Sequence, residues 1–250
     1  MTLNKPQGNM YEFITHTWNP IRGKCFHGCT YCYMQGKWSR SYQYLDTSEL
    51  TGTFKSGQFI FIGSSTDFCS QKVESEWIKQ VFDFCYKNNP IDIFGERAKF
   101  LLQTKNPERL LDFINHPLLN PENDTTVVCT TLETNRHLQR FMQNAPTPQN
   151  RAESMAKIAN RGIKTYVTVE PIIDFDLESF VELIRICHPE QVNIGYNTSK
   201  TAKLPNPTLA NMINLCRALS EFTVVAPKEN SGELKENLRQ LDIPFKDKND

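Results

Sequence analysis

Lys24-Cys25-Phe26-His27-Gly28-Cys29-Thr30-Tyr31-Cys32-Tyr33 decides how this chain is interpreted, because it brings three cysteines into one short loop. The spacing C-x₃-C-x₂-C allows three thiolates to converge on one iron–sulfur cluster. Gly28 gives the loop the backbone freedom to wrap around inorganic sulfide, and exposed loop amides can hydrogen-bond to the cluster. Three thiolates hold three irons of a [4Fe–4S] cube. The fourth iron then stays open to a small ligand that chelates it through an amine and a carboxylate.

A zinc site is the alternative use of the same thiols. Three cysteines with His16 or His27 make a Cys₃His set, which is common in structural zinc sites. Such sites usually pair two short ligand arms, and the sequence has no second C-x₂-C or H-x₃-H arm. Residues 1–6 lack the charged and then apolar run of a secretory signal, which disfavours disulfides. The sequence therefore favours an iron–sulfur cluster, with reduced thiols in the cytoplasm.

Composition limits the class of protein. The 250 residues are 39% hydrophobic, enough for one substantial core, and no stretch approaches the roughly 20 apolar residues of a membrane span. With 28 basic and 28 acidic residues, the chain has no overall charge that would attract polyanions. Binding of DNA therefore requires a local basic patch. Basic residues do gather at 97–109 and at 136–151, although such groupings are more typical of a solvated helix face.

Short β-rich runs alternate with amphipathic helical runs along the chain, which predicts repeated βα units around a parallel sheet. The expected strands are 15–21, 59–62, 100–103, 126–131, 165–169, 192–195 and 222–225. Apolar residues at helical spacing predict helices between them, one of which spans 151–161. Cys85, Cys187 and Cys216 fall on the buried faces of these helices and are expected in the core.

We predict an α/β fold, a single domain built as a partial (β/α)6-type parallel TIM-like barrel. The barrel core covers about residues 15–226, and a C-terminal helix and tail cover 227–250. An open doubly wound sheet is the alternative. Length favours the partial barrel, since a full eight-stranded barrel takes about 250 residues and part of this chain lies in connections.

Polar residues follow most of the predicted strands, where the active face of either architecture lies. The segments are Gly63-Ser64-Ser65-Thr66-Asp67, Thr104-Lys105-Asn106-Pro107, Thr130–Asn135, Glu170-Pro171 and Tyr196-Asn197-Thr198. Each alone is typical of a helix cap or a turn. Together with the cysteine loop they predict a lined pocket, in which Lys105 reaches toward a carboxylate, and Glu133 and Asn135 offer acceptors to ribose hydroxyls or an ammonium.

The cysteine loop, with Tyr31 just before its last cysteine, resembles the C-x₃-C-x-Φ-C motif of the radical S-adenosylmethionine superfamily. The resemblance implies a [4Fe–4S] cluster on Cys25, Cys29 and Cys32. It implies that this cluster reduces bound S-adenosylmethionine to methionine and a 5′-deoxyadenosyl radical, which removes hydrogen from the substrate. Tyr31 is then expected beside the adenine. The turn of Gly63, Ser64 and Ser65 is expected at the methionine amine, although the family's usual residues there are Gly-Gly-Glu. An electron donor such as flavodoxin or ferredoxin is also implied.

Further along the chain, the Ser-x-Asp turn that ends at Asp67, the Thr104-Lys105 pair, Thr147-Pro148-x-x-Arg151 and Glu170-Pro171-Ile172 are similar to spore photoproduct lyase and its relatives. This likeness implies that Lys105 holds the methionine carboxylate and that Thr131 contacts the cofactor. Asp67, Glu133, Asn135 and Arg151 complete the expected cofactor site. The hydrogen-donating cysteine of the lyase has its match at Ser64, and Cys69 lies downstream.

Thr17-Trp18-Asn19-Pro20, residues 101–109 and Val169-Glu170-Pro171 are similar, over nearly the whole chain, to a phage-associated radical family. Some members are linked to thymidine hypermodification, in which a glycyl-thymine in DNA is isomerised to an aminoethyl-uracil. The resemblance implies an isomerase of a thymine-derived base in DNA or in a modified nucleotide, working in the host cytoplasm if the chain is phage-encoded. The expected catalytic residues are Cys69, Glu170 and Tyr196. A repair lyase and a non-catalytic iron–sulfur or zinc protein are the alternatives.

Overall fold

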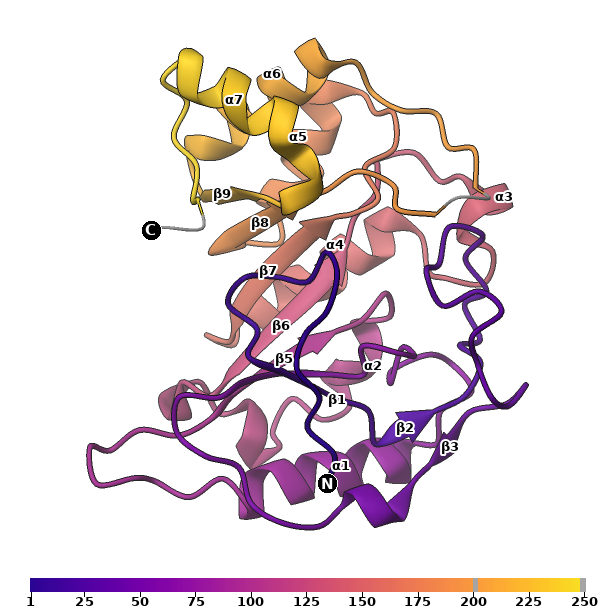
Figure 1. Ribbon diagram of the computed structural model, residues 1–250, viewed down its shortest axis with the longest axis vertical. Helices are drawn as coiled ribbons and strands as arrows, with labels where there is room; N and C mark the ends of the chain where they lie inside the picture. Colours follow the sequence, from indigo (N-terminus) through magenta and orange to yellow (C-terminus); the bar gives the residue numbers. More distant parts are fainter. Residues whose placement is uncertain (200–201, 248–250) are drawn as a thin grey trace.

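The computed structural model describes residues 1–199 and 202–247, and its centre is one parallel sheet (Figure 1). The strands are β1 (His16–Trp18), β4 (Phe59–Ile62), β5 (Lys99–Gln103), β6 (Thr126–Thr131), β7 (Lys164–Val169), β8 (Gln191–Ile194) and β9 (Val224–Pro227). They lie side by side in chain order, and each neighbouring pair is parallel. A doubly wound sheet reverses its strand order at a switch point, which this sheet does not do. The partial TIM-like barrel is therefore confirmed.

Helices connect the strands and cover one face of the sheet. The longer ones are α1 (Ser75–Lys87), α4 (Pro148–Ala159), α5 (Leu177–Arg185), α6 (Leu209–Ser220) and α7 (Gly232–Gln240), and the short ones are α2 (Glu108–Leu111) and α3 (Gln139–Met142). Alternate strand residues such as Phe100 and Leu102 join the helices in the main core. Cys85, Cys187 and Cys216 are fully buried in this core, as predicted.

The lumen face of the sheet is partly filled by the N-terminal segment, residues 7–14. Figure 1 shows this segment crossing in front of the middle strands. Tyr11 and Ile14 pack on Phe61, Leu101 and Cys129, which point to the lumen from three neighbouring strands. An isolated bridge between Asn4 and Thr17 ties the start of the segment to β1. The segment therefore forms a wall of the lumen, although it comes before the first strand.

The first and the last predicted strands have wrong boundaries for local reasons. The first strand ends at Trp18 instead of residue 21, because Asn19-Pro20 interrupts it, and Ile21–Arg22 (β2) pairs instead with Tyr44–Leu45 (β3). The last strand begins at Val224 instead of residue 222, because the amides of Phe222 and Thr223 still bond to the carbonyl of Leu219 at the end of α6.

The predicted C-terminal helix is α7, whose Leu234 and Leu238 are buried in the main core. Residues 248–250 of the predicted tail lie outside the described residues. The helix predicted over 151–161 begins earlier, at Pro148, since the Thr147 hydroxyl caps it by accepting from the Asn150 amide at 3.1 Å. Within the described part of the chain, no helix has the length and apolar character to cross a membrane.

Candidate active site

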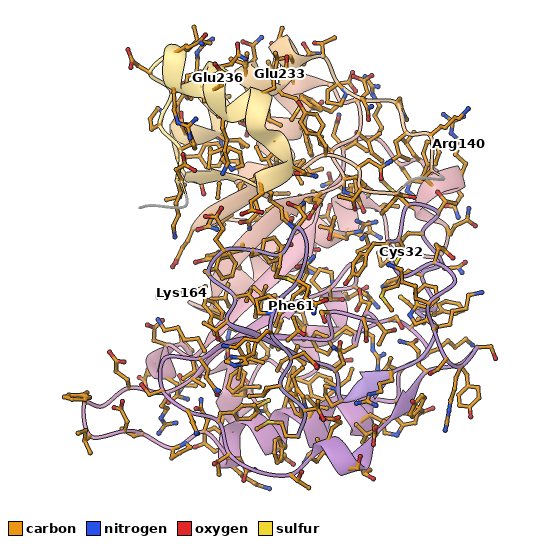
Figure 2. All side chains as sticks on the ribbon, in the orientation of Figure 1. Cys32, Phe61, Arg140, Lys164, Glu233 and Glu236 are labelled. Atoms are coloured by element: carbon orange, nitrogen blue, oxygen red, sulfur yellow. The ribbon has the colours of Figure 1, made fainter. Side chains whose placement is uncertain are left out.

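A cavity of about 380 Å³ lies at the carboxyl ends of the strands, within the size range of ligand sites. Figure 2 shows Cys32 at this end of the sheet, whereas Lys164, at the start of β7, lies at the opposite end. Most of the residues predicted for the site line the cavity. They are Cys25, Cys29, Tyr31, Cys32, Gly63, Ser64, Ser65, Asp67, Lys105, Thr131, Glu170 and Tyr196. The other four, Cys69, Glu133, Asn135 and Arg151, lie outside this lining.

The cysteine loop is held in place by a segment that the sequence did not connect with it. The Thr30 amide donates to the Phe141 carbonyl at 3.0 Å, and the Asn144 amide donates to the His27 carbonyl at 2.9 Å. Within the loop, the Cys32 amide closes a turn on the Cys29 carbonyl at 3.2 Å, and Gly28 has a φ of +68° that favours glycine. The chain just after α3 therefore fixes the position of the three thiols.

Both histidines of the predicted zinc alternative have a polar partner at one ring nitrogen. His27 Nε2 lies 3.0 Å from Asp67 Oδ2, and His16 Nδ1 lies 2.9 Å from Thr15 Oγ1. Among residues 1–199 and 202–247, no three Cys, His, Asp or Glu side chains converge as ligands of a single metal ion. The three cysteines share one cavity. A cubane suits that arrangement, because it offers each thiolate a separate iron.

Burial favours the protonated form of two of the three thiols in the absence of a metal. Burial, with the nearby Asp67 carboxylate, raises the pKa of Cys25 to about 12, against the effect of the backbone amides of Asp67 and His27. Burial also raises the pKa of Cys29, although Lys105 acts in the opposite direction. A metal that binds such a thiol displaces its proton. Of the described cavity residues, His27 has a buried Nδ1 without a hydrogen-bond partner. The donor set and this unpaired atom fit a [4Fe–4S] cluster.

Asp67 joins the cysteine loop to the ends of two strands. Its carboxylate contacts His27, accepts from the Thr104 hydroxyl at 2.7 Å and the Lys105 amide at 2.7 Å, and accepts from the Cys69 amide at 2.9 Å. Burial alone would raise its pKa, but His27 and these hydrogen bonds lower the pKa of Asp67 to about 2. Asp67 lines the cavity, yet its oxygens are already engaged with the protein. Its geometry supports a positioning role.

Replacing Asp67 with asparagine is expected to remove an acid-sensitive part of the stability. The pKa of this carboxyl is about 2 in the folded chain and about 3.9 unfolded, so the native interactions contribute roughly 2 kcal/mol above pH 4. This contribution is lost as the pH falls from 4 to 2. Urea unfolding of the chain and of Asp67→Asn should therefore differ most at pH 7 and progressively less below pH 4.

The matched control for this experiment is Asp176→Asn, which removes the exposed partner of Arg136. Exposed ion pairs contribute little, so this variant should unfold much as the unmodified chain does at every pH. If Asp67→Asn showed the same loss of stability at pH 3 as at pH 7, the ionised Asp67 would not be the cause.

Glu133 and Arg151 form a fully buried ion pair behind the cysteine loop. Arg151 Nη1 donates to Glu133 Oε2 at 2.8 Å and to the Thr131 carbonyl at 2.8 Å. The Tyr31 hydroxyl donates to Glu133 Oε1, and Lys105 Nζ lies 3.5 Å from the same oxygen. Burial opposes ionisation, but Arg151 and Lys105 together lower the pKa of Glu133. Glu133 and Arg151 therefore hold Tyr31 and Lys105, which themselves line the cavity.

Cys69 and Asn135 lie away from the cavity in different ways. Cys69 is fully buried in the main core, and burial raises the pKa of its thiol well above the usual value. Asn135 faces the start of α5, where its Oδ1 accepts from the Asp176 amide at 3.0 Å and its Nδ2 donates to Ser179 Oγ at 2.8 Å. In this structure neither side chain is placed to meet a ligand in the cavity.

The cavity residues that the sequence analysis missed include Asn9, Tyr11 and Lys228. Lys228 directly follows β9, so correct placement of that strand would have identified it by the strand-end rule. Asn9 and Tyr11 belong to the N-terminal segment, where no sequence period indicates which residues face the lumen. Asn9 Nδ2 and Lys228 Nζ each lie 2.6 Å from an oxygen of Glu170.

No protein-family model and no curated protein matches this chain. Among solved structures, a mutant of spore photoproduct lyase with dinucleoside spore photoproduct aligns with a TM-score of 0.59 and 13% identity, covering 88% of this chain and 78% of that one. Another mutant of the lyase, with bound AdoMet and dinucleoside spore photoproduct, aligns with a TM-score of 0.53 and 15% identity, covering 86% and 64%. At this identity the likeness is one of fold, and it agrees with the partial barrel derived from the strand order.

Proposed function

We propose that this chain is a radical S-adenosylmethionine enzyme that acts on a thymine-derived base. The observation that carries the proposal is that Cys25, Cys29 and Cys32, spaced as in the superfamily motif, line the cavity at the open end of a partial barrel. When bound, the [4Fe–4S] cluster and S-adenosylmethionine supply a carbon radical that abstracts hydrogen from the substrate. We assign the whole described chain to one such domain, with the barrel core and C-terminal helix as predicted.

The chain's own residues then bind and orient the cofactor. The turn of Gly63, Ser64 and Ser65 lines the cavity and is held in place by Trp38, whose Nε1 donates to the Ser65 carbonyl at 2.9 Å. Lys105 stays cationic because Cys29 and Glu133 raise its pKa against the effect of burial. A cation beside the cysteine loop supports the expected role of Lys105 at the methionine carboxylate. The contact of Tyr31 with Glu133 holds its ring at the cavity wall, which supports the expected role of Tyr31 beside the adenine.

The thiols of the cavity favour an isomerase over a repair lyase. Of the described cysteines, those that line the cavity are Cys25, Cys29 and Cys32, which the cluster requires. A lyase of the spore photoproduct type returns hydrogen from a further thiol. Ser64 stands at the matching position here, and Cys69 is buried in the core. An isomerisation requires no thiol donor from the protein, so this observation supports rearrangement of a glycyl-thymine to an isomer that keeps its carboxyl group. Formation of an aminoethyl-uracil from that isomer would require a separate loss of carbon dioxide.

The proposal is tested by reconstituting the chain anaerobically with iron and sulfide and adding dithionite and S-adenosylmethionine. Dithionite replaces the flavodoxin or ferredoxin that we expect as donor. We expect 5′-deoxyadenosine in the mixture, and an isomer of unchanged mass when glycyl-thymidine is supplied in an oligonucleotide or as the nucleotide. Repair of a dimer-containing oligonucleotide instead would favour the lyase. An intact cluster that yields neither 5′-deoxyadenosine nor the isomer would contradict the proposal.

A further inference from the structure

Asn9, Glu170 and Lys228 form a polar cluster on the cavity wall, and none of them is among the residues to which a cofactor role is given above. They come from the N-terminal segment, the end of β7 and the end of β9. Asn9 Nδ2 lies 2.6 Å from Glu170 Oε1, and Lys228 Nζ lies 2.6 Å from Glu170 Oε2. One carboxylate is thus flanked by an amide donor on one oxygen and by an ammonium donor on the other.

The surrounding backbone is shaped to hold this carboxylate. A Cβ atom at Gly195 would lie 3.1 Å from both Cδ and Oε1 of Glu170, so the glycine leaves room for the carboxylate against the end of β8. The Lys228 amide donates to the Ile194 carbonyl at 2.8 Å, which fixes the start of that side chain. Because several elements converge on it, the cluster is positioned before any ligand arrives.

The polar cluster of Asn9, Glu170 and Lys228 retains hydrogen-bonding capacity toward the cavity. A lysine ammonium has three donors, and each carboxylate oxygen has two lone pairs. Lys228 Nζ contacts Glu170 and lies 4.4 Å from the centre of the Tyr11 ring, while its side chain is only 7% exposed. Such a partly buried polar set binds most strongly to a ligand that satisfies all of its members, since a group left unpaired is costly.

We propose that Asn9, Glu170 and Lys228 recognise the imide edge of a thymine or uracil base. The three side chains present a donor, an acceptor and a donor, in that order. The imide edge presents the complement: a carbonyl oxygen, the N3–H and a second carbonyl oxygen. Cytosine carries an amino group and an unprotonated N3 in place of one carbonyl and the N3–H, so it mismatches the array at two positions. The inference rests on the proposed function, for which it names the part of the substrate that is recognised.

The test is calorimetric binding of thymidine, 3-methylthymidine and deoxycytidine to the full, cluster-loaded chain. We expect thymidine to bind at least about tenfold more tightly than either of the others, because both mismatch the Glu170 acceptor. Glu170→Gln should abolish most of this preference, since an amide nitrogen replaces one acceptor. Lys228→Met should weaken thymidine binding by about tenfold or more.

Lys235→Met is the matched control, because Lys235 and Lys228 are each 8% exposed and Lys235 pairs outside the cavity with Asp247. It should keep the thymidine preference. Equal affinity for the three nucleosides, or an unchanged preference for thymidine in Glu170→Gln, would overturn the inference. The comparison of nucleosides uses the unmodified chain, so it does not depend on whether a variant folds. Selective thymidine binding by a chain that forms neither 5′-deoxyadenosine nor the isomer would contradict the proposed function and leave this inference standing.

Discussion

Cys29→Ala is expected to lose the iron–sulfur cluster and, with it, the formation of 5′-deoxyadenosine. Cys29 is buried in the middle of the loop, and its sulfur lies 3.6 Å from the Met142 carbonyl in the segment that anchors the loop. Removing a residue that only hydrogen-bonds to a metal ligand typically lowers metal affinity about 10- to 100-fold. Removing one of the three ligands themselves should therefore lower cluster affinity by more than about 100-fold. Iron and sulfide content, visible absorption and 5′-deoxyadenosine formation should fall to background together.

The matched control is Cys85→Ala, which removes a fully buried thiol from the main core. This variant leaves the three cavity thiols in place and should retain the cluster, with a small loss of stability. Cys25→Ala and Cys32→Ala should behave as Cys29→Ala does. A complete cluster in any of these three variants would show that the triplet is not the ligand set.

Glu133→Gln is expected to produce the largest loss of stability from a single isosteric change. Arg151 and Glu133 are both fully buried, so the variant leaves the guanidinium without its countercharge. Breaking a buried pair in this way typically costs about 3–5 kcal/mol. The change also weakens the anchor of Tyr31 and Lys105, so S-adenosylmethionine binding should fall as well. Urea unfolding of the cluster-free chain and calorimetry of S-adenosylmethionine binding measure the two effects.

Two further variants separate charge from packing. Asp83→Asn removes the partner of the exposed Lys79 and should cost no more than about 1 kcal/mol. Glu133→Leu combined with Arg151→Met removes both buried charges and should recover much of the stability that Glu133→Gln loses, because neither charge is left unpaired. If Glu133→Gln unfolded with the same free energy as Asp83→Asn, the pair would not stabilise the cysteine loop as we argue.

The sequence predicted those elements that are bounded on both sides by strong local signals. Residues 59–62 and 126–131 form strands with the predicted bounds, since each is an apolar or β-branched run between turn residues. The C-terminal boundary of the sheet was wrong because Phe222 and Thr223 have high strand propensity but remain bonded to the end of α6. Strand propensity alone does not show that these two residues still belong to the last turn of the preceding helix.

The sequence predicted which strand ends contribute to the site. Lys105 and Glu170 line the cavity as the strand-end rule indicates. Glu133 follows a strand equally closely, yet it pairs with Arg151 behind the cysteine loop. The rule places a residue at an edge of the sheet, whereas the direction of its side chain beyond the strand depends on partners that are distant in sequence. Asn9 was missed for the same reason, because its partners Glu170 and Asn230 follow β7 and β9, far from it in sequence.

The path of the N-terminal segment has a consequence for the order of folding. Asn9 bonds to Glu170 and to Asn230, which follow it by 161 and 221 residues. Contacts between such distant residues form late, because the long loop between them must first be closed. During synthesis, the cysteine loop therefore emerges from the ribosome before the later strands that complete the cavity around it. We expect the cavity wall formed by Asn9, Glu170 and Lys228 to assemble only after the last strand has been synthesised.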